Sequence, residues 1–200
     1  MAQKEEQKGK EISNDANQDI EYIKSKIGTH PNFPKENINF RDVFPVLRDP
    51  KGFEMIMNRL CNYVQTKFGG SIDAIVGLDS RGFLFGPIMA LRLKCAFVPI
   101  RKKGKLPGKC ISQQFEKEYG KDVLEIQQGC VKPGDNVIIV DDLLATGGTL
   151  EAAYKLLVDE QIKANVKAAV LVIELNDLDG RARLSGIGLK EVYSLIQYDD

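Results

Sequence analysis

The stretch that most constrains the fold runs from Val137 to Leu150 and reads VIIVDDLLATGGTL. Its first four residues are apolar and branched, which is typical of a strand buried on both faces. Two aspartates follow, then a loop of small residues with two glycines, and then the spacing of a helix. A strand that passes through such a turn into a helix favours an α/β fold.

The rest of the chain alternates strand and helix patterns in the same way. Its central apolar runs are continuous rather than alternating, which indicates strands covered on both faces. We therefore expect an α/β fold with a central, mostly parallel sheet of about five strands, flanked by helices on both faces. The expected strands are 72–76, 95–100, 124–127, 137–140, 166–175 and, at an edge, 191–198; the main expected helices are 53–68, 83–93 and 149–160.

Three segments lack a clear core-forming pattern. Residues 1–19 are polar and rich in Lys, Glu, Gln and Asn, which predicts a mobile tail, and a short helix is expected from Ile20. Residues 30–45 contain three prolines, so we expect an ordered loop there rather than a regular element. Residues 101–122 are basic and poor in aliphatic side chains, which predicts a long flexible loop with a functional role. Residues 20–200 are expected to form a single domain.

Composition narrows the class of protein. A chain of 200 residues suits one domain, and a formal net charge of zero gives no field that favours nucleic acid or membranes. No apolar run approaches the roughly 20 residues of a membrane helix, and the N-terminus lacks a signal-peptide core. The four cysteines and one histidine lack the spacing of a zinc site or a disulfide framework. We therefore expect buried or half-buried free thiols and a cytoplasmic protein.

The glycine-rich turn has the features of an anion site. Thr146, Gly147, Gly148 and Thr149 open a helix after a strand, where glycines allow close approach and free N–H groups point at a ligand. The turn has no lysine, so it suits one phosphate rather than a triphosphate. The preceding aspartates would repel that phosphate, so we expect them to face a polyol or a hydrated Mg²⁺ beside it. The pattern therefore indicates a sugar phosphate.

Other nucleotide and metal motifs fit less well. An apolar strand that ends in an acid is typical of ATPases, but the chain has no G-x-x-x-x-G-K-[ST] loop. The GIGLKE stretch lacks the third glycine of a dinucleotide fingerprint and precedes a strand. The NDLDGR stretch fails the spacing of a calcium loop after Asp179, so a turn or a helix start is expected there.

An apolar strand followed by two aspartates and ATGGT resembles the ribose-phosphate motif of type I phosphoribosyltransferases, which use phosphoribosyl pyrophosphate (PRPP). Further stretches resemble the adenine-specific branch of this family, and the likeness covers about residues 20–198. The five stretches, in chain order, are FRD at 40–42, GLDSRGFLFGP at 77–87, RKKGKLPG at 101–108, EYG at 118–120 and VDDLLATGGT at 140–149.

The resemblance implies a fold, a reaction and partners. The fold is that of a type I phosphoribosyltransferase, with a small hood at about 20–48 and a mobile loop at about 101–122. The reaction is the Mg²⁺-dependent transfer of the phosphoribosyl group from PRPP to adenine, giving AMP and pyrophosphate in purine salvage. The Mg²⁺ would be held mainly by PRPP and water rather than by the protein, and the family forms homodimers.

The resemblance also implies residue roles. The loop at 79–82 carries a cis non-proline peptide bond in the family and binds pyrophosphate together with basic residues of the mobile loop. Arg81 and Glu118 are the implied catalytic residues, with Glu118 handling a proton at the adenine ring. The implied contacts are Asp79, Ser80, Arg81, Gly82, Arg101, Lys102 and Lys105 for pyrophosphate, Asp141 and Asp142 for ribose, Ala145, Thr146, Gly147, Gly148 and Thr149 for the 5′-phosphate, and Asn39, Phe40, Arg41 and Leu143 for adenine.

The chain departs from the family at two places. Phe115, Glu116 and Lys117 stand where Tyr-x-Leu is common, which affects the expected packing of the closed hood. Asn39 replaces a base-reading valine, which matters only if its side chain faces adenine. Three alternatives stay open: a phosphoribosyltransferase for hypoxanthine, guanine or orotate, a non-catalytic regulator that keeps the PRPP pocket, and nucleic-acid binding through the basic residues 101–109.

Overall fold

The computed structural model describes residues 17–117 and 120–199. The chain divides into two compact units, residues 1–58 and 59–200. Helix α3 (Pro50–Phe68) begins in the first unit and ends in the second. Its expected apolar face is confirmed, because Ile56, Leu60 and Val64 are fully buried.

The first unit contains a helix, a hairpin and a short second helix. Residues 17–26 are helical, so the helix takes in residues 17–19, which the sequence had assigned to the tail. Strands β1 (Gly28–Pro31) and β2 (Asn39–Asp42) pair in antiparallel fashion, and α2 (Phe44–Leu47) follows. The expectation of residues 1–16 as a tail lies outside the described residues.

The prediction of an irregular loop at 30–45 was wrong, and the positions of its prolines explain why. Pro31 is the last residue of β1, where a missing N–H costs little in a two-stranded sheet. Pro34 lies in the connection between the strands, and Pro45 lies in the first turn of α2, where an N–H would have no helical partner. The prolines therefore lie at the ends of regular elements or between them, and they do not indicate that the segment lacks regular elements.

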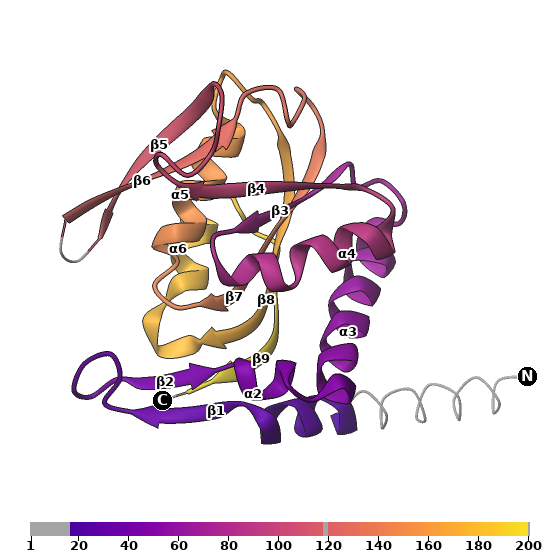
Figure 1. Ribbon diagram of the computed structural model, residues 1–200, viewed down its shortest axis with the longest axis vertical. Helices are drawn as coiled ribbons and strands as arrows, with labels where there is room; N and C mark the ends of the chain where they lie inside the picture. The colour runs from indigo at the N-terminus through magenta and orange to yellow at the C-terminus, as the bar shows by residue number, and fades with distance from the viewer. Residues whose placement is uncertain (1–16, 118–119, 200) are drawn as a thin grey trace, which may run out of the picture. The chain divides into compact units, whose positions relative to one another are not determined.

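The second unit is built on a seven-stranded sheet in the order β5-β6-β4-β3-β7-β8-β9 (Figure 1). The run from β4 to β9 is parallel, while β6 pairs antiparallel with both β4 and β5. The mostly parallel sheet is thus confirmed, with β9 at one edge as expected. The strands are β3 (Ala74–Leu78), β4 (Ala96–Lys102), β5 (Cys110–Lys117), β6 (Gly120–Gln127), β7 (Asn136–Leu144), β8 (Asn165–Leu175) and β9 (Val192–Tyr198).

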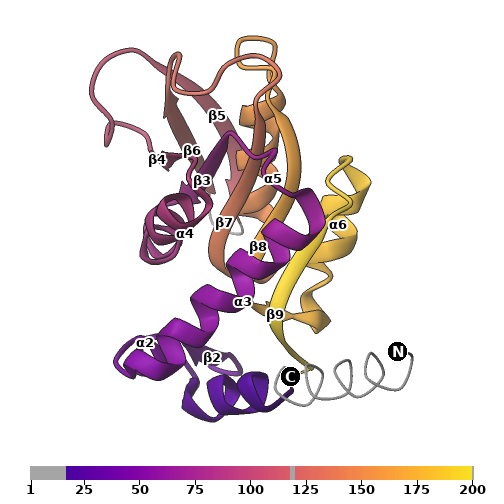
Figure 2. The same ribbon diagram turned by 90° about the vertical axis from the view of Figure 1, so that its right-hand side faces the viewer.

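Helices cover both faces of this sheet (Figure 2). A 3-10 turn η1 (Arg81–Leu84) and α4 (Gly86–Leu93) follow β3, and α4 lies on one face. Helices α5 (Gly148–Val158) and α6 (Gly180–Gly186) lie on the other face, with the 3-10 turn η2 (Asn176–Leu178) before α6. Right-handed crossovers explain this split, because the chain moves from β3 to β4 in one direction and from β7 through β8 to β9 in the other.

The segment at 101–122, expected as a long loop, is mostly a hairpin, while its expected flexibility and functional role stay predictions. Strand β4 continues to Lys102, and β5 and β6 occupy the chain from Cys110 on, with the gap at 118–119. Alternation was present in the sequence: Ile111 is buried, its neighbour Ser112 is exposed, and Phe115 is half-buried. The alternation was hard to recognise because polar residues also occupy inward positions of the hairpin. A hairpin with one solvent-exposed face needs few aliphatic side chains.

The four cysteines are free thiols, as the sequence indicated. Cys61 is buried and Cys95 and Cys110 are partly buried, whereas Cys130 is exposed, which differs from the expectation. Among the described residues, no helix combines the length and the apolarity needed to cross a bilayer.

Candidate active site

Two polar turns meet where the strand order reverses. The loop that begins at Asp79 follows β3, and Asp141 lies in the last part of β7, which pairs with β3 in parallel. The chain continues from β3 toward β4 and from β7 toward β8, in opposite directions across the sheet. Such a switch point leaves a crevice at the carboxyl ends of the two strands, which is where parallel sheets bind ligands.

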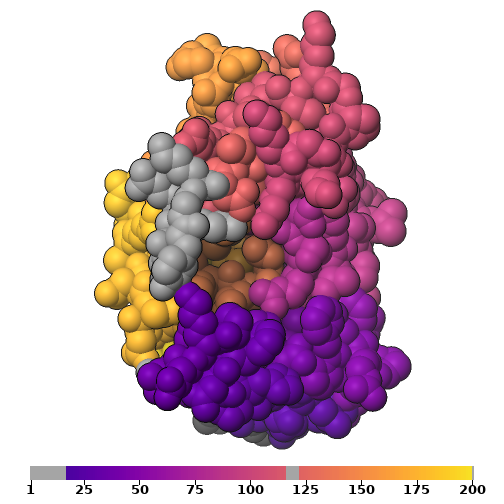
Figure 3. All heavy atoms as spheres, turned by 60° about the vertical axis from the view of Figure 1, so that its left-hand side comes forward, coloured from indigo at the N-terminus to yellow at the C-terminus, as the bar shows by residue number. Residues whose placement is uncertain are grey.

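A pocket of about 450 Å³ occupies this position in the second unit. Figure 3 shows the molecule from the side on which the surface is hollowed, with orange atoms from the second half of the chain at the floor. Most residues that line the pocket carry charges or hydroxyl groups, so it suits a polar, charged ligand. They are Asp79, Ser80, Arg81, Lys102, Phe115, Asp122, Leu124, Asp141, Asp142 and Thr149.

The first turn closes tightly against β7. The Asp79–Ser80 peptide bond is cis, as the resemblance implied. A side chain at Gly82 would overlap the carbonyl oxygen of Val140, so only glycine lets the turn approach the strand this closely. The approach brings Arg81 to the two aspartates of β7.

The two aspartates lie inside the strand rather than in a loop after it. Strand β7 keeps its pairing with β8 as far as Leu144, so successive side chains alternate between its faces. Asp142 is almost fully buried, with 3% of its side chain exposed, and Arg81 Nε lies 2.9 Å from its Oδ2. Asp141 Oδ1 accepts a hydrogen bond of 2.9 Å from the backbone N–H of Asp142.

Burial governs the titration of this pair. It raises the pKa of Asp141 well above its ordinary value, and the charge of Asp142 raises it further. Burial also raises the pKa of Asp142, although the Arg81 guanidinium opposes that shift. A ligand that donates hydrogen bonds to Asp141 would favour the ionised form of that carboxyl.

The basic residues of the site are paired with carboxylates. Arg101 Nε lies 2.8 Å from Asp79 Oδ2, and a further nitrogen of Arg101 donates to the carbonyl of Lys105 at 3.2 Å. Lys102 Nζ lies 3.4 Å from Asp122 Oδ2. Asp79, Lys102 and Asp122 line the pocket, and a polyanionic ligand bound there would compete with the two carboxylates for the cationic side chains.

The second turn leads into α5. Gly147 is the N-cap residue, with a φ of +77°, a conformation that side chains rarely adopt. Because this cap has no side chain, the first N–H groups of α5 are directed at whatever lies before the helix. Thr149 lines the pocket in the first turn of α5. The start of α5 is therefore suited to an anion.

Seven of the residues predicted for pyrophosphate, ribose and 5′-phosphate line the same pocket: Asp79, Ser80, Arg81, Lys102, Asp141, Asp142 and Thr149. The ligand contacts predicted for them stay predictions. Asn39, Phe40 and Arg41 belong to β2 in the first unit, whereas Leu143 belongs to β7 in the second. Their common contact with a base stays a prediction. Glu118 lies outside the described residues.

Two lining residues were missed from the sequence. Asp122 and Leu124 line the pocket from β6, and Phe115, which was considered only for packing of the hood, lines it from β5. Phe115 pairs with Asp122, so their side chains share a face of the hairpin with that of Leu124. Only 124–127 was expected as a strand, so the sequence did not indicate this shared face.

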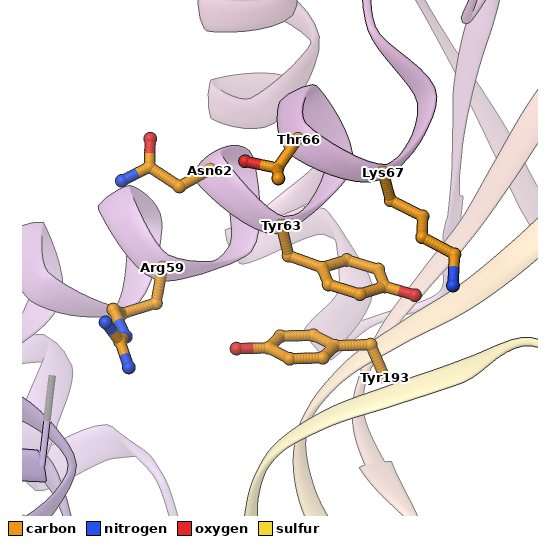
Figure 4. A pocket seen from close by; sticks show the side chains of 6 residues that line it. All are labelled: Arg59, Asn62, Tyr63, Thr66, Lys67 and Tyr193. Carbon is orange, nitrogen blue, oxygen red and sulfur yellow. The ribbon is translucent and has the colours of Figure 1, made fainter. Parts of the chain in front are cut away.

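A second pocket of about 430 Å³ lies between α3 and β9 (Figure 4). The rings of Tyr63 and Tyr193 stack there, with centroids 4.0 Å apart and an interplanar angle of 9°. The Tyr63 hydroxyl donates to Glu191 at 2.5 Å, and Lys67 Nζ lies 3.3 Å from the same carboxylate. The carboxylate of Glu191 is thus paired with both Tyr63 and Lys67, and the two tyrosine rings are stacked. Such pairing is typical of a packing contact rather than of a reactive site.

The pattern of the family described as "Phosphoribosyl transferase domain" matches residues 46–191. The chain belongs to the phosphoribosyltransferase family. It is 45% identical to adenine phosphoribosyltransferase of Bos taurus over 184 residues, which are 92% of this chain and 99% of that one. It is 46% identical to the enzyme of the same name from Mus musculus, with 90% of this chain and 98% of that one covered.

Solved structures of the family agree with the fold. Adenine phosphoribosyltransferase from Saccharomyces cerevisiae, in a complex with an imino-altritol bisphosphate and adenine, superposes with a TM-score of 0.84 at 44% identity. The match covers 90% of this chain and 99% of that one. The expected α/β architecture of a type I phosphoribosyltransferase is thereby confirmed.

Proposed function

We propose that this protein transfers the phosphoribosyl group of PRPP to adenine and forms AMP and pyrophosphate, as in purine salvage. The observation that carries the proposal is that one pocket at the switch point is lined by Asp79, Ser80 and Arg81, by the two aspartates of β7 and by Thr149 of α5. The identity of about 45% with adenine phosphoribosyltransferases over most of the chain supports adenine as the base.

The charges of the pocket suit the parts of PRPP. The N–H groups at the start of α5, with Thr146 and Thr149, hold the 5′-phosphate. Asp141 and Asp142 accept hydrogen bonds from the ribose hydroxyls. The positive charges of Arg81, Arg101 and Lys102 offset the negative charge of the pyrophosphate.

Catalysis depends on charge that develops on the leaving group. As the bond between the anomeric carbon and pyrophosphate breaks, the leaving oxygen gains negative charge, and Arg81 stabilises it most at that stage. Arg81 is held in place by Asp142, which is buried beneath it. Arg101 and Lys102 exchange their carboxylate partners for phosphate oxygens as the ligand binds.

The site also suits Mg²⁺, the metal that the family uses. Two adjacent carboxylates next to a pyrophosphate site offer the hard oxygen donors that Mg²⁺ prefers. Mg²⁺ usually keeps several waters and binds through substrate phosphates, so PRPP and water would supply most of its ligands. When bound, Mg²⁺ neutralises charge on the leaving pyrophosphate.

Glu118 is proposed to manage the proton of the base. Adenine must lose the N9 proton as N9 bonds to the ribose carbon, and a carboxyl at N7 balances charge across the ring. We expect Glu118→Gln to slow the chemical step by about 10²–10⁴-fold, because it removes the titrating group but keeps the shape. Glu116→Gln is the matched control and should cost almost nothing. Equal, small effects in single-turnover kinetics would remove Glu118 from this role.

The resemblance to the family supports recognition of the edge of the base, with Asn39, Phe40, Arg41 and Leu143 as the proposed adenine-binding residues. Adenine presents an amino donor where hypoxanthine presents a carbonyl acceptor. A site built for one leaves buried groups unpaired with the other, and rejection of about 10⁴–10⁵-fold is attainable.

The decisive experiment is an assay of nucleotide formation from PRPP with each base in turn. We expect AMP from adenine, loss of turnover when EDTA removes Mg²⁺, and very low turnover with hypoxanthine, guanine or orotate. Comparable efficiency with adenine and hypoxanthine would overturn the choice of base. Absence of any turnover, with PRPP still bound, would indicate a non-catalytic regulator.

A homodimer in the cytoplasm is proposed on the same basis, because the family is dimeric and because the four cysteines are free thiols. Light scattering at working concentration tests the assembly, and the mass of a monomer would exclude it.

A further inference from the structure

The first residue of α6 packs directly against the turn that precedes α5. A side chain at Gly180 would overlap the carbonyl oxygen of Ala145, and its Cβ would lie 2.7 Å from Leu144 Cδ1. In return, a Cβ at Gly147 would lie 3.0 Å from the carbonyl oxygen of Gly180. The two backbones therefore touch with no side chain between them.

The close approach, rather than backbone conformation, requires glycine at position 180. The neighbouring Asp179 has a positive φ, but Gly180 does not, so alanine could adopt the backbone angles of position 180. Glycine is also a poor helix former, and alanine would favour α6. Glycine at position 180 thus weakens α6, and only the contacts with Ala145 and Leu144 exclude alanine. We infer that the close contact between α6 and the turn has a role of its own.

A second contact joins the same two elements one turn further along α6. Arg183 forms an ion pair with Glu151, which lies in the first turn of α5 and also pairs with Lys155 at 2.6 Å. The hydrogen bonds from Lys155 and Arg183 lower the pKa of Glu151, so this carboxyl is ionised at neutral pH. A nitrogen of Arg183 would lie 3.6 Å from a Cβ at Gly148. Helix α6 thus contacts the turn through Gly180 and the first turn of α5 through Arg183.

We propose that Gly180 is a positioning residue for the 5′-phosphate of PRPP and AMP. The inference rests on the proposed role of residues 145–149 as the phosphate loop. By letting α6 approach, Gly180 fixes the backbone of Ala145 to Gly147, and this backbone aims the first N–H groups of α5. A displacement of about 1 Å at such a site can cost about 100-fold in rate.

The test compares Gly180→Ala with Gly186→Ala, its matched control at the other end of α6. A Cβ at Gly186 meets no atom within 4 Å, and its φ is not positive, so the same substitution there adds a methyl group in open space. We expect Gly180→Ala to weaken AMP binding and to raise the KM for PRPP by about tenfold or more. The rise in KM should account for more of the loss in kcat/KM than any fall in kcat does. Gly186→Ala should match the wild type in both.

Adenosine, which lacks the 5′-phosphate, separates positioning from a general loss of structure. We expect Gly180→Ala to bind adenosine as the wild type does, so that only the advantage of AMP over adenosine shrinks. Equal losses for AMP and adenosine, or wild-type AMP affinity and KM, would overturn the inference. A wild-type chain that binds AMP but makes none would refute the proposed function, and the binding comparison would still decide the role of Gly180.

A variant that does not fold leaves a measurement on the wild type. Hydrogen exchange with and without AMP should show slower exchange at 145–150 and at 179–183 together, because the phosphate and α6 restrain the same turn. Protection at 145–150 with unchanged exchange at 179–183 would contradict the proposal.

Discussion

Adjacent aspartates at the end of β7 have different surroundings, although they share a sequence motif. Asp142 is buried and ion-paired with Arg81, so it holds the arginine in place. Asp141 is only partly buried and has the more strongly raised pKa, because both burial and the charge of Asp142 oppose its ionisation. The two residues are therefore expected to contribute differently, Asp142 to the geometry of the site and Asp141 to a pH-dependent contact with ribose.

We predict that AMP binding releases a proton at pH values below the raised pKa of Asp141. Below its raised pKa, Asp141 is protonated in the free protein, whereas ribose hydroxyls donate stronger hydrogen bonds to the ionised carboxylate. The affinity for AMP should therefore fall as the pH drops through that pKa. Calorimetry in two buffers with different heats of ionisation measures the proton release, and Asp141→Asn should release none. Equal proton release by this variant would assign the proton to another group.

The same shift has a consequence for folding, and its sign is opposite to that of an ordinary ion-paired aspartate. Because the folded-state pKa is raised, the folded protein binds the proton more tightly than the unfolded chain. The contribution of Asp141 to stability is therefore largest below the unfolded-state pKa and is lost as the pH rises through the folded-state pKa. Binding of AMP then offsets a cost that the empty site carries at neutral pH.

At the level of residues, the sequence predicted the polar turns better than the walls of the pocket. Arg81, Asp141 and Thr149 stand in short motifs whose residue types are unusual next to buried strands. Asp122 and Leu124 stand in no motif, and they reach the pocket only because β6 pairs with β4. Long-range pairing of this kind leaves no mark on the local sequence.

At the level of elements, the ring of Phe97 packs where β3, β4 and α4 meet. Phe97 of β4 lies between Gly77 of β3 and Gly86 of α4, and its ring meets Phe83 edge-on at 5.8 Å. A Cβ at Gly77 would lie 2.7 Å from Phe97 Cε2, and a Cβ at Gly86 would lie 2.6 Å from the same atom. The two glycines therefore provide the space for the ring.

We predict that Gly86→Ala destabilises the protein by about 1–3 kcal/mol, because the added methyl group overpacks the space occupied by Phe97. Gly70→Ala is the control, since a Cβ there meets no atom within 4 Å and its φ is not positive. Urea unfolding measures both free energies. If the two variants unfold at the same urea concentration, Phe97 adapts to the methyl group and the packing argument is wrong.

The sequence predicted buried elements well and half-exposed elements poorly. The expected ranges of β7, β8 and α5 overlap those in the structure, because continuous apolar runs and helical periodicity survive without any knowledge of the neighbours. The β1–β2 hairpin and most of the β5–β6 hairpin were interpreted as loops, and only residues 124–127 of β6 were expected as a strand. Their strands carry polar residues on one face and proline or glycine nearby, so their local patterns resemble those of irregular chain.

At the level of the whole molecule, the sequence predicted a parallel sheet but gave no basis for the order of its strands. The order depends on which strands meet across long stretches of chain, and β3 pairs with β7 although three strands lie between them in sequence. The crevice was expected from the two polar turns alone, since turns after parallel strands open at the same edge of the sheet.

That pairing also affects how the polypeptide matures on the ribosome. Strand β3 acquires β4 on one side soon after synthesis, but its other side stays without a neighbour until Asn136 to Leu144 have emerged. The β5–β6 hairpin cannot shield it, because that hairpin extends the sheet beyond β4. A nascent chain thus carries an apolar, unpaired strand edge for the time needed to translate the whole hairpin, and such edges recruit other chains. The strand order that creates the ligand crevice therefore also leaves β3 with an unpaired edge during synthesis, and this edge needs protection from aggregation until β7 emerges.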